Sequence, residues 1–339
     1  MQFHRRLVLA AAVLAFAVIS LGAFVRLSDA GLGCPDWPGC YGHWLGVPDQ
    51  MHEQLAANQA FPERPVNSEK AWKEMIHRYF AGTLGLLILG IFLHAWRSET
   101  RRLQSPALPT LLLGVVGLQA ALGMWTVTLL LKPLIVTLHL LGGMTTLALL
   151  LTLLLRSGDA SPAHSPPGWL RPLAATVLLL VIAQIALGGW VSSNYAALAC
   201  QDFPLCQGHW RPPMDLAQAF TLHRELGYGG DGRLLSAEAL TAIHWMHRVG
   251  ALLVLCGGGL LALTLLRGTW PGGRFWGWFL LGLLAIQLGL GIANVLLSLP
   301  LPLAVAHNLG AAGLLSATLA INIRLNQKKS PRQDDLRGL

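Results

Sequence analysis

Eight apolar segments, each about as long as a membrane span, alternate with polar connections along the chain. A helix that crosses the hydrocarbon layer of a bilayer needs about 20 consecutive apolar residues, and in lipid only helices or closed barrels satisfy the backbone. Continuous runs of this length are typical of helices. We therefore predict eight transmembrane helices, at residues 7–27, 73–96, 107–130, 133–155, 172–193, 240–266, 275–298 and 302–323.

The composition agrees with this prediction and removes one competing class of function. Of the 339 residues, 54% are hydrophobic and only 12% are charged, about half the charged fraction of a soluble domain. The net charge of +8 is compatible with nucleic-acid binding, but the sequence lacks basic patches interleaved with aromatic residues. Because positive charge in a membrane protein usually follows its topology, we exclude nucleic acid as a partner and expect a lipid bilayer around the chain.

Arginine and lysine are distributed unevenly between the two sides of the predicted helices. If the N-terminus lies inside, the inner segments carry 14 basic and four acidic residues, whereas the outer segments carry 10 basic and 12 acidic residues. An excess of positive charge marks the cytoplasmic side. We therefore predict that both termini are cytoplasmic and that two long loops, at about 28–72 and 194–239, lie outside. The inner charges are Arg5, Arg6, Arg97, Glu99, Arg101, Arg102, Arg156, Asp159, Arg171, Arg267, Arg274, Arg324, Lys328, Lys329, Arg332, Asp334, Asp335 and Arg337.

The chain contains an internal repeat. The segments Leu21–Trp44 and Leu187–Trp210 align at an offset of 166, with 12 of 24 positions identical, including two cysteines and a Gly-His-Trp sequence. An even number of helices separates equivalent elements, so both halves face the same way, unlike the inverted repeats of many transporters. Further matches, at offsets of 168 to 170, are Met75–Arg78 with Trp245–Arg248, Gln119 with Gln287, Gly123 with Gly291, Val127 with Val295 and His139 with His307.

The repeat predicts the fold class and the organisation of the chain. We expect an all-α integral membrane protein whose eight transmembrane helices form two tandem, parallel-repeated four-helix bundles. The N-terminal bundle is predicted at 1–156 and the C-terminal bundle at 172–325. A cytoplasmic linker at 157–171 joins them, and a cytoplasmic tail follows at 326–339.

Four of the five cysteines form two matching pairs in the predicted outer loops, Cys34 with Cys40 and Cys200 with Cys206. An oxidising outer compartment permits disulfides, and we expect one disulfide within each loop. A redox-active dithiol that passes electrons is the alternative, while metal binding is disfavoured because the spacing lacks a paired CxxC. The fifth, Cys256, lies inside a predicted helix, where we expect it to pack.

Four histidines occupy matching positions in the two halves: His77 and His139 in the first, His247 and His307 in the second. Each lies near the start of a helix that enters from the outer side, so all four are expected at a similar depth. Ionisable residues in membrane spans are costly and usually mark function. Two imidazoles on facing helices are a common way to bind heme iron axially, and we favour this role over that of interfacial histidines hydrogen-bonded to neighbours.

Other residues near these histidines have roles that the sequence leaves open. Arg78 and Arg248 follow the first histidine of each pair, where they can pair with heme propionates or extend to lipid headgroups. His43 and His209 lie in the loops beside the cysteines and are as compatible with a structural role as with a functional one.

The two halves differ three residues before the His-Arg pair, where the first half has Glu74 and the second has His244. Residues i and i+3 share a helix face, so we expect Glu74 to point toward the same site as His77. A carboxylate beside a heme can accept protons. The alternative is an acid favoured by the helix dipole near the N-terminus. The difference suggests a reaction site in the first half and an electron-transfer or structural heme in the second.

Together these features resemble the heme A synthase family. The resemblance covers the chain from Leu21 to about Ala320 and includes paired loop cysteines, which occur in one bacterial branch of that family. It implies oxidation of the C8 methyl group of heme O to the formyl group of heme A, by successive hydroxylations and loss of water, for terminal cytochrome oxidases. The motifs that carry it are Glu74-x-x-His77-Arg78, Met246-His247-Arg248, His139 and His307.

The resemblance also implies individual roles. His77 and His139 would mark the substrate heme site with Glu74 as its essential acid, and His247 and His307 would ligate the iron of a heme B cofactor. Heme O synthase (protoheme farnesyltransferase) and an electron acceptor are the expected partners, and a bacterial cell inner membrane is the expected location. Neither the family nor the pattern assigns a role to His244 or settles whether the chain forms homo-oligomers.

Two other functions remain open from the sequence. A di-heme, quinol-linked electron-transfer cytochrome explains the four histidines equally well, but it does not explain the difference at Glu74. A heme transporter is disfavoured by the parallel repeat and by the lack of a charge at the bilayer midplane or of a broken helix.

Overall fold

The computed structural model describes residues 2–97, 105–156 and 167–327, and in these residues it contains eight helices long and apolar enough to cross a membrane. The all-helical, multi-pass fold predicted from the sequence is confirmed. The spans are α1 (Gln2–Leu27), α3 (Ser68–Ala95), α5 (Ala107–Thr128), α6 (Pro133–Arg156), α7 (Leu170–Ser193), α9 (Ala237–Arg267), α10 (Gly273–Leu296) and α11 (Leu301–Asn326).

The described residues do not cover every sequence prediction. Most of the proposed linker, at 157–166, and most of the tail, at 328–339, lie outside them. The same is true of part of the charge pattern used for orientation. The charged residues concerned are Glu99, Arg101, Arg102, Asp159, Lys328, Lys329, Arg332, Asp334, Asp335 and Arg337.

Helices α3 and α9 begin before their apolar segments because a polar residue caps each of them. Helix α3 begins at Ser68 because Asn67 caps it, its Oδ1 accepting a hydrogen bond from the Lys70 N–H at 3.0 Å. Helix α9 begins at Ala237 because Ser236 caps it, its Oγ accepting a hydrogen bond from the Ala239 N–H at 3.1 Å. These polar first turns extend the helices by about one turn beyond the apolar runs, which hydrophobicity alone does not detect.

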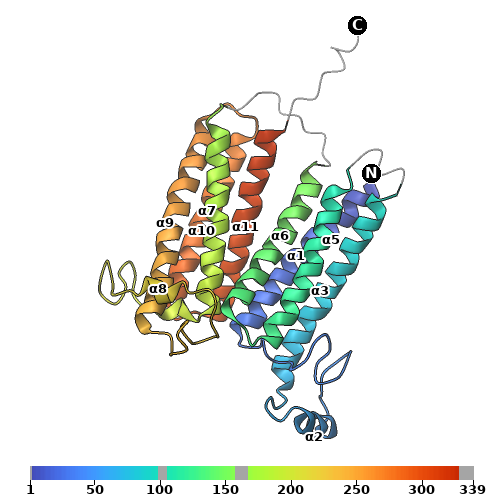
Figure 1. Ribbon diagram of the computed structural model, residues 1–339. Helices are drawn as coiled ribbons and strands as arrows, with labels where there is room; N and C mark the ends of the chain where they lie inside the picture. Colours follow the sequence, from blue (N-terminus) through green and yellow to red (C-terminus); the bar gives the residue numbers. More distant parts are fainter. Residues whose placement is uncertain (1, 98–104, 157–166, 328–339) are drawn as a thin grey trace.

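The spans form two bundles of four helices each, seen side by side in Figure 1. In the first, α1 packs on α3, α3 on α5, α5 on α6, and α6 back on α1. In the second, α7, α9, α10 and α11 close a ring in the same order. We call the end at which α1 begins and α11 ends the terminal end of the bundles, and the opposite end the loop end.

The loop end carries the long connections and the short helices. These are α2 (Met51–Ala60), the 3₁₀ helix η1 (Ala196–Leu198) and α8 (Leu216–Ala219). In Figure 1, α2 lies beyond the first bundle and α8 lies beside the loop end of α9. Helices α3, α6, α9 and α11 all begin at the loop end, so the four histidines near their starts lie at that end.

The bundles pack against each other through four helices. Helix α6 contacts α7 and α11, and α1 contacts α11. Because α1 corresponds to α7 and α6 to α11 in the sequence repeat, exchanging the halves leaves this set of contacts unchanged. A small residue allows the close approach of α6 and α7, since a Cβ at Gly189 would lie 3.0 Å from the Leu140 Cδ2.

The two ends of the bundles differ in packing. Most of the large, fully buried side chains lie toward the terminal end, namely Ile88, Ile91, Leu112, Leu147, Leu150, Leu261, Leu265, Leu280, Ile321 and Leu325. By contrast, the four repeat-matched histidines are only half-buried. The protein is therefore closely packed where no cofactor is expected, and its side chains leave the histidines partly uncovered at the loop end.

The prediction that Cys256 packs inside the protein is wrong. Its side chain is exposed on the surface of α9. Apolar composition does not distinguish the two faces of a membrane helix, because the lipid-facing surface is as apolar as the interior.

Candidate functional site

A disulfide closes a tight turn at the loop end of each half. Cys34 is joined to Cys40, and the side chain of Asp36 accepts hydrogen bonds from the N–H groups of Tyr41 (2.6 Å) and Gly42 (2.8 Å). Gly42 has a φ of +80°, which a glycine adopts without strain. The second half repeats the turn with Cys200, Cys206, Asp202, Gln207 and Gly208.

Beside this turn, the backbones of His43 and His209 take part in closing the disulfide loops. The N–H and C=O of His43 pair with those of Cys40, at 3.0 and 2.9 Å, and His209 pairs with Cys206 in the same way. This gives both histidines, whose role the sequence left open, a structural place in the turn.

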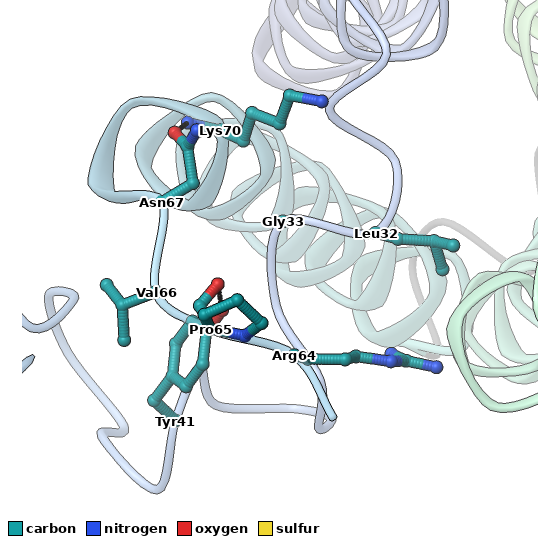
Figure 2. A pocket seen from close by; sticks show the side chains of 8 residues that line it. All are labelled: Leu32, Gly33, Tyr41, Arg64, Pro65, Val66, Asn67 and Lys70. Atoms are coloured by element: carbon teal, nitrogen blue, oxygen red, sulfur yellow. Dashed lines mark hydrogen bonds between the residues drawn. The ribbon is translucent and has the colours of Figure 1, made fainter. Parts of the chain in front are cut away.

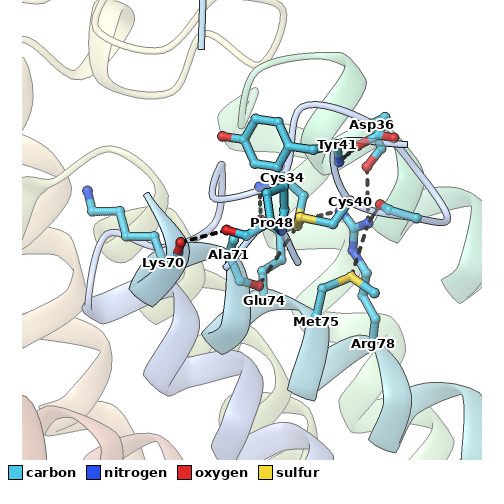
Figure 3. Close-up of a disulfide and its surroundings, with 12 residues drawn as sticks. Cys34, Asp36, Cys40, Tyr41, Pro48, Lys70, Ala71, Glu74, Met75 and Arg78 are labelled. Atoms are coloured by element: carbon cyan, nitrogen blue, oxygen red, sulfur yellow. Dashed lines mark hydrogen bonds and ion pairs between the residues drawn. A yellow bond between two sulfur atoms is a disulfide. The ribbon is translucent and has the colours of Figure 1, made fainter. Parts of the chain in front are cut away.

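Glu74 and Arg78 attach the first disulfide loop to α3 (Figure 3). Glu74 Oε2 accepts a hydrogen bond from the Cys34 N–H at 3.0 Å, and Oε1 forms a buried ion pair with Arg78. Arg78 Nη1 in turn donates to the carbonyl oxygens of Asp36, at 3.0 Å, and of Gly39. One carboxylate oxygen of Glu74 thus contacts the loop directly, and the other is linked to the loop through Arg78.

His244 occupies the equivalent place in the second half. Its Nδ1 lies 3.3 Å from the Cys200 N–H nitrogen and its Nε2 lies 3.2 Å from the Arg248 Nε. Arg248 also donates to the carbonyl oxygens of Leu205 (2.7 Å) and Asp202 (2.9 Å). A neutral imidazole has only one nitrogen that can accept, whereas a carboxylate accepts at both oxygens, so Glu74 makes the stronger attachment.

These contacts change the interpretation of the asymmetry between the halves. The sequence suggested that Glu74 faces the same site as His77, and it left open whether Arg78 and Arg248 pair with heme propionates or extend to lipid headgroups. In the structure, the charged groups of Glu74, Arg78 and Arg248 all contact the disulfide loops, and those of Glu74 and Arg78 also contact each other. Sequence spacing places a residue on a helix face, but it does not reveal that a distant loop folds over that face.

The histidines come together as one pair in each bundle. His77 on α3 and His139 on α6 both lie at the loop end of the first bundle, and His247 on α9 and His307 on α11 both lie at the loop end of the second, within electrostatic range of each other. In the described part of the chain, no three His, Cys, Asp or Glu side chains converge on one point. Two histidines per site is the number of axial ligands that a heme iron takes.

Each of these histidines packs its ring against a glycine of the neighbouring helix. A Cβ at Gly22 would lie 3.1 Å from the Cε1 of His77, tighter than ordinary van der Waals contact. The other three pairs have the same arrangement, at 3.2 to 3.3 Å, and they are Gly123 with His139, Gly188 with His247 and Gly291 with His307. All four glycines lie at repeat-matched positions in the sequence, but their contact with the histidine rings is visible only in the structure.

Buried ring nitrogens without a protein partner are compatible with ligation of a heme iron at these pairs. The Nδ1 atoms of His77, His139 and His307 are buried and have no hydrogen bond among the described residues. Leaving a buried polar group unpaired costs about 1–3 kcal/mol. A ring that is held in place with an uncommitted nitrogen is suited to bind iron. At the fourth histidine, His247, the Gln184 Nε2 lies 3.0 Å from Nδ1 and 3.5 Å from Nε2. Each bundle thus has at least one histidine with an unpaired ring nitrogen, and the residues fit a heme in each bundle.

The pockets at the loop end lie away from the histidines. One, of about 430 Å³, is lined by Leu32, Gly33, Tyr41, Arg64, Pro65, Val66, Asn67 and Lys70 (Figure 2). Another, of about 460 Å³, lies at the equivalent place in the second half and is lined by Leu198, Ala199, Gln201, Asp202, Gln207 and Gly208. The first contains two cationic residues and the second contains none, but neither includes a histidine of the two pairs.

Comparison with known proteins agrees with this arrangement. The family model of COX15-CtaA, described as cytochrome oxidase assembly protein, matches residues 5–319. The heme A synthase of Shewanella oneidensis is 45% identical over 94% of this chain and 95% of its own length. The heme A synthase of Methylobacterium radiotolerans is 31% identical over 93% of this chain and 88% of its own length. The chain therefore belongs to the COX15-CtaA family of cytochrome oxidase assembly proteins.

Proposed function

We propose that this protein is a heme A synthase, which oxidises the C8 methyl group of heme O to the formyl group of heme A for terminal cytochrome oxidases. The observation that carries the proposal is the presence of two separate histidine pairs, one in each bundle, in a chain that is 45% identical to a heme A synthase over nearly its whole length.

The first pair would hold the substrate and the second a cofactor. In this assignment His77 and His139 bind heme O in a bundle that includes residues 1–156, and His247 and His307 bind heme B in a bundle that includes residues 172–325. The bound heme B would supply electron transfer. The histidines fix the two macrocycles in separate bundles, and the glycines against their rings keep each imidazole in one orientation.

Glu74 is the residue that supports placing the reaction in the first half. Its carboxylate is buried and lies one turn from His77 on α3. Removing hydrogen from a methyl group releases protons, which a nearby carboxylate can accept. Because Glu74 also holds the Cys34 N–H, we propose that it both accepts a proton and fixes the disulfide loop over the substrate site.

Arg78 and Arg248 would act mainly through the same loops. Their guanidinium groups donate to loop carbonyl oxygens, so any contact with heme propionates would have to use donors that remain. The disulfides Cys34–Cys40 and Cys200–Cys206 would keep both loops in the shape that these arginines require.

The surroundings of the protein follow from the charge pattern and the proposed reaction. We propose a bacterial inner membrane with both termini cytoplasmic, as the excess of positive charge on the inner segments indicates. Heme O synthase would supply the substrate, and an electron acceptor outside this chain would take the electrons released by the oxidation.

The heme content of the purified protein tests the proposed sites. Protein from cells that make heme O should contain heme B together with heme O or heme A, as measured by pyridine hemochrome spectra and mass spectrometry. Replacing His247 or His307 with alanine should remove the heme B. If heme B is the only heme in both bundles, the protein is a di-heme electron-transfer cytochrome. If both alanine variants retain all of the heme B, the ligand assignment is wrong.

A further inference from the structure

Three of the four histidines are held by a glutamine of the neighbouring helix. The first is His139 on α6, whose backbone carbonyl oxygen accepts a hydrogen bond from the Nε2 of Gln119 on α5 at 2.9 Å. The amide oxygen of Gln119 lies against Gly142, at a position where a Cβ would collide with it. The glutamine therefore fixes the helix backbone at the histidine itself.

The second half contains this arrangement twice. Gln184 Nε2 donates to the carbonyl oxygen of His247 at 2.9 Å and also lies 3.0 Å from its Nδ1. Gln287 Nε2 donates to the carbonyl oxygen of His307 at 3.0 Å and lies 3.4 Å from its Nε2. Their amide oxygens occupy the space that a Cβ at Gly250 and at Gly310, respectively, would take.

The glutamine and the glycine form one structural unit. On one helix the glutamine precedes by four residues the glycine that packs on the histidine ring, as Gln119 precedes Gly123. On the next helix a second glycine follows the histidine by three residues, as Gly142 follows His139. Residues four and three apart share a helix face, so a side chain at the second glycine position would displace the glutamine. We call this unit the glutamine clamp.

His77 is the exception. Its ring packs against Gly22 as the others do, but Val18 stands four residues before that glycine and Phe80 stands three residues after the histidine. The valine side chain has no hydrogen-bond donor, and no side chain among the described residues donates to the His77 carbonyl oxygen. At His77, both the glutamine and the second glycine of the clamp are thus replaced, while the other three histidines keep both.

We propose that the three glutamine clamps fix His139, His247 and His307 as permanent ligands, and that His77 without a clamp is the exchangeable ligand. This inference rests on the proposed function. A substrate heme must enter and its product must leave, whereas a cofactor heme stays bound. In the first bundle, His77 can then release the iron while His139 holds it, so that a substrate heme can enter and its product can leave. In the second bundle, two fixed histidines keep the cofactor heme bound. Gln119, Gln184 and Gln287 are then positioning residues that act through the histidines.

Carbon monoxide provides a test that does not depend on turnover. It binds a reduced heme only when an axial histidine has left the iron, so its binding rate reports how readily a ligand dissociates. We would measure this rate on the complete protein, purified from cells that make heme O. The double variant V18Q/F80G installs a clamp at His77, and Q119L removes the clamp at His139. Q287L, which removes a clamp in the other bundle, is the matched control.

The proposal predicts opposite effects of the two changes. The wild-type protein should bind carbon monoxide at the heme of the first bundle. V18Q/F80G should slow this binding about fivefold or more, as expected for one added hydrogen bond. Q119L should accelerate it. Q287L should instead make the heme of the second bundle reactive. The Soret band of the unaltered bundle reports folding in every variant.

Two results would overturn the inference. If V18Q/F80G and Q119L both retain heme in the first bundle and bind carbon monoxide at the wild-type rate, the clamps do not control ligand release. If the first bundle of the wild-type protein contains no heme at all, the inference fails together with the proposed function.

Discussion

Arg26 donates a hydrogen bond to the backbone carbonyl of Ser192 at 2.6 Å, and Ser192 is its own counterpart 166 residues later in the repeat. A second pair at the same offset also touches, because the Tyr195 hydroxyl donates to Asp29 at 3.2 Å. A residue can contact its own counterpart only near the axis that relates the two halves. The axis therefore passes between the loop ends of α1 and α7.

These two contacts, Arg26 with Ser192 and Tyr195 with Asp29, should hold the bundles together at a place separate from the proposed heme sites. We call this place the joint between the bundles. Replacing Arg26 with alanine removes both its hydrogen bond and its stacking over the Tyr195 ring, 4.1 Å away. We expect it to lower the stability by about 1–2 kcal/mol, measured by thermal unfolding in detergent, with both hemes retained. Tyr195→Phe loses only the bond to Asp29 and should have a smaller effect. Equal stability of R26A and the wild type would contradict this view of the joint.

The glycines against the histidine rings give a second prediction. Gly291→Ala should displace His307, because the new Cβ would lie 3.2 Å from its Cε1, and should weaken heme binding in the second bundle only. Gly289→Ala, two residues earlier on α10, is the matched control since a Cβ there meets no atom within 4 Å. Heme retention during purification, followed by the Soret absorbance, should fall for G291A alone. An equal fall for G289A would show that a change in helix geometry, and not the contact with the His307 ring, is responsible.

A third prediction separates the two roles proposed for Glu74. Glu74→Ala should reduce heme A formation by about a hundredfold or more, as expected for loss of a proton acceptor, with heme B retained. Glu74→His copies the residue of the second half and can keep the contact with the Cys34 N–H that His244 makes with Cys200. We expect E74H to protect the disulfide from reductants while remaining inactive. Recovery of most of the activity in E74H would mean that Glu74 acts only by holding the loop.

The turn around Asp202 should depend on pH. Hydrogen bonds from the backbone N–H groups of Gly208 and then Gln207 hold the pKa of Asp202 below its ordinary value. A lowered pKa in the folded state stabilises the turn above the pKa of the unfolded carboxyl, about 4. This contribution is lost as the pH falls through the lower folded value.

Hydrogen–deuterium exchange, corrected for intrinsic rates, measures this effect. The Gln207 and Gly208 amides should be protected at pH 5–7 and lose protection below about pH 4. Asp202→Asn, which removes the charge, should weaken the protection already at pH 7. Unchanged protection at pH 3 in the wild-type protein would contradict the assignment.

The helices and the histidine pairs could be predicted from the sequence because both leave strong signals. Apolar runs of membrane length locate the eight spanning helices within about five residues. The repeat matches His77 with His247 and His139 with His307, so that each half contains two of the four histidines. The exposure of Cys256 was not predictable, since it depends on neighbours that are distant in the sequence, and the capped polar first turns of α3 and α9 leave no hydrophobic signal.

The surroundings of the histidines needed the structure. Glu74 was recognised as a break in the repeat, but its contact with Cys34 joins residues 40 positions apart. The glutamine clamps were visible only in part, because Gln119 and Gln287 match each other while Gln184 matches Val18. Recognising Gln184 as the third clamp requires the packing of α7 on α9, which turns the mismatch at Val18 into the distinguishing feature of His77.

Heme analysis after co-expression with a heme O-producing farnesyltransferase tests the central claim most directly. In a host without its own heme A synthase, this chain should lead to heme A, or to its hydroxylated intermediate, in pyridine hemochrome spectra and by mass spectrometry. His77→Ala in the same host should abolish both products while heme B stays bound. Persistence of heme O as the only farnesylated heme, in cells that contain the folded, heme B-loaded protein, would contradict the proposed function.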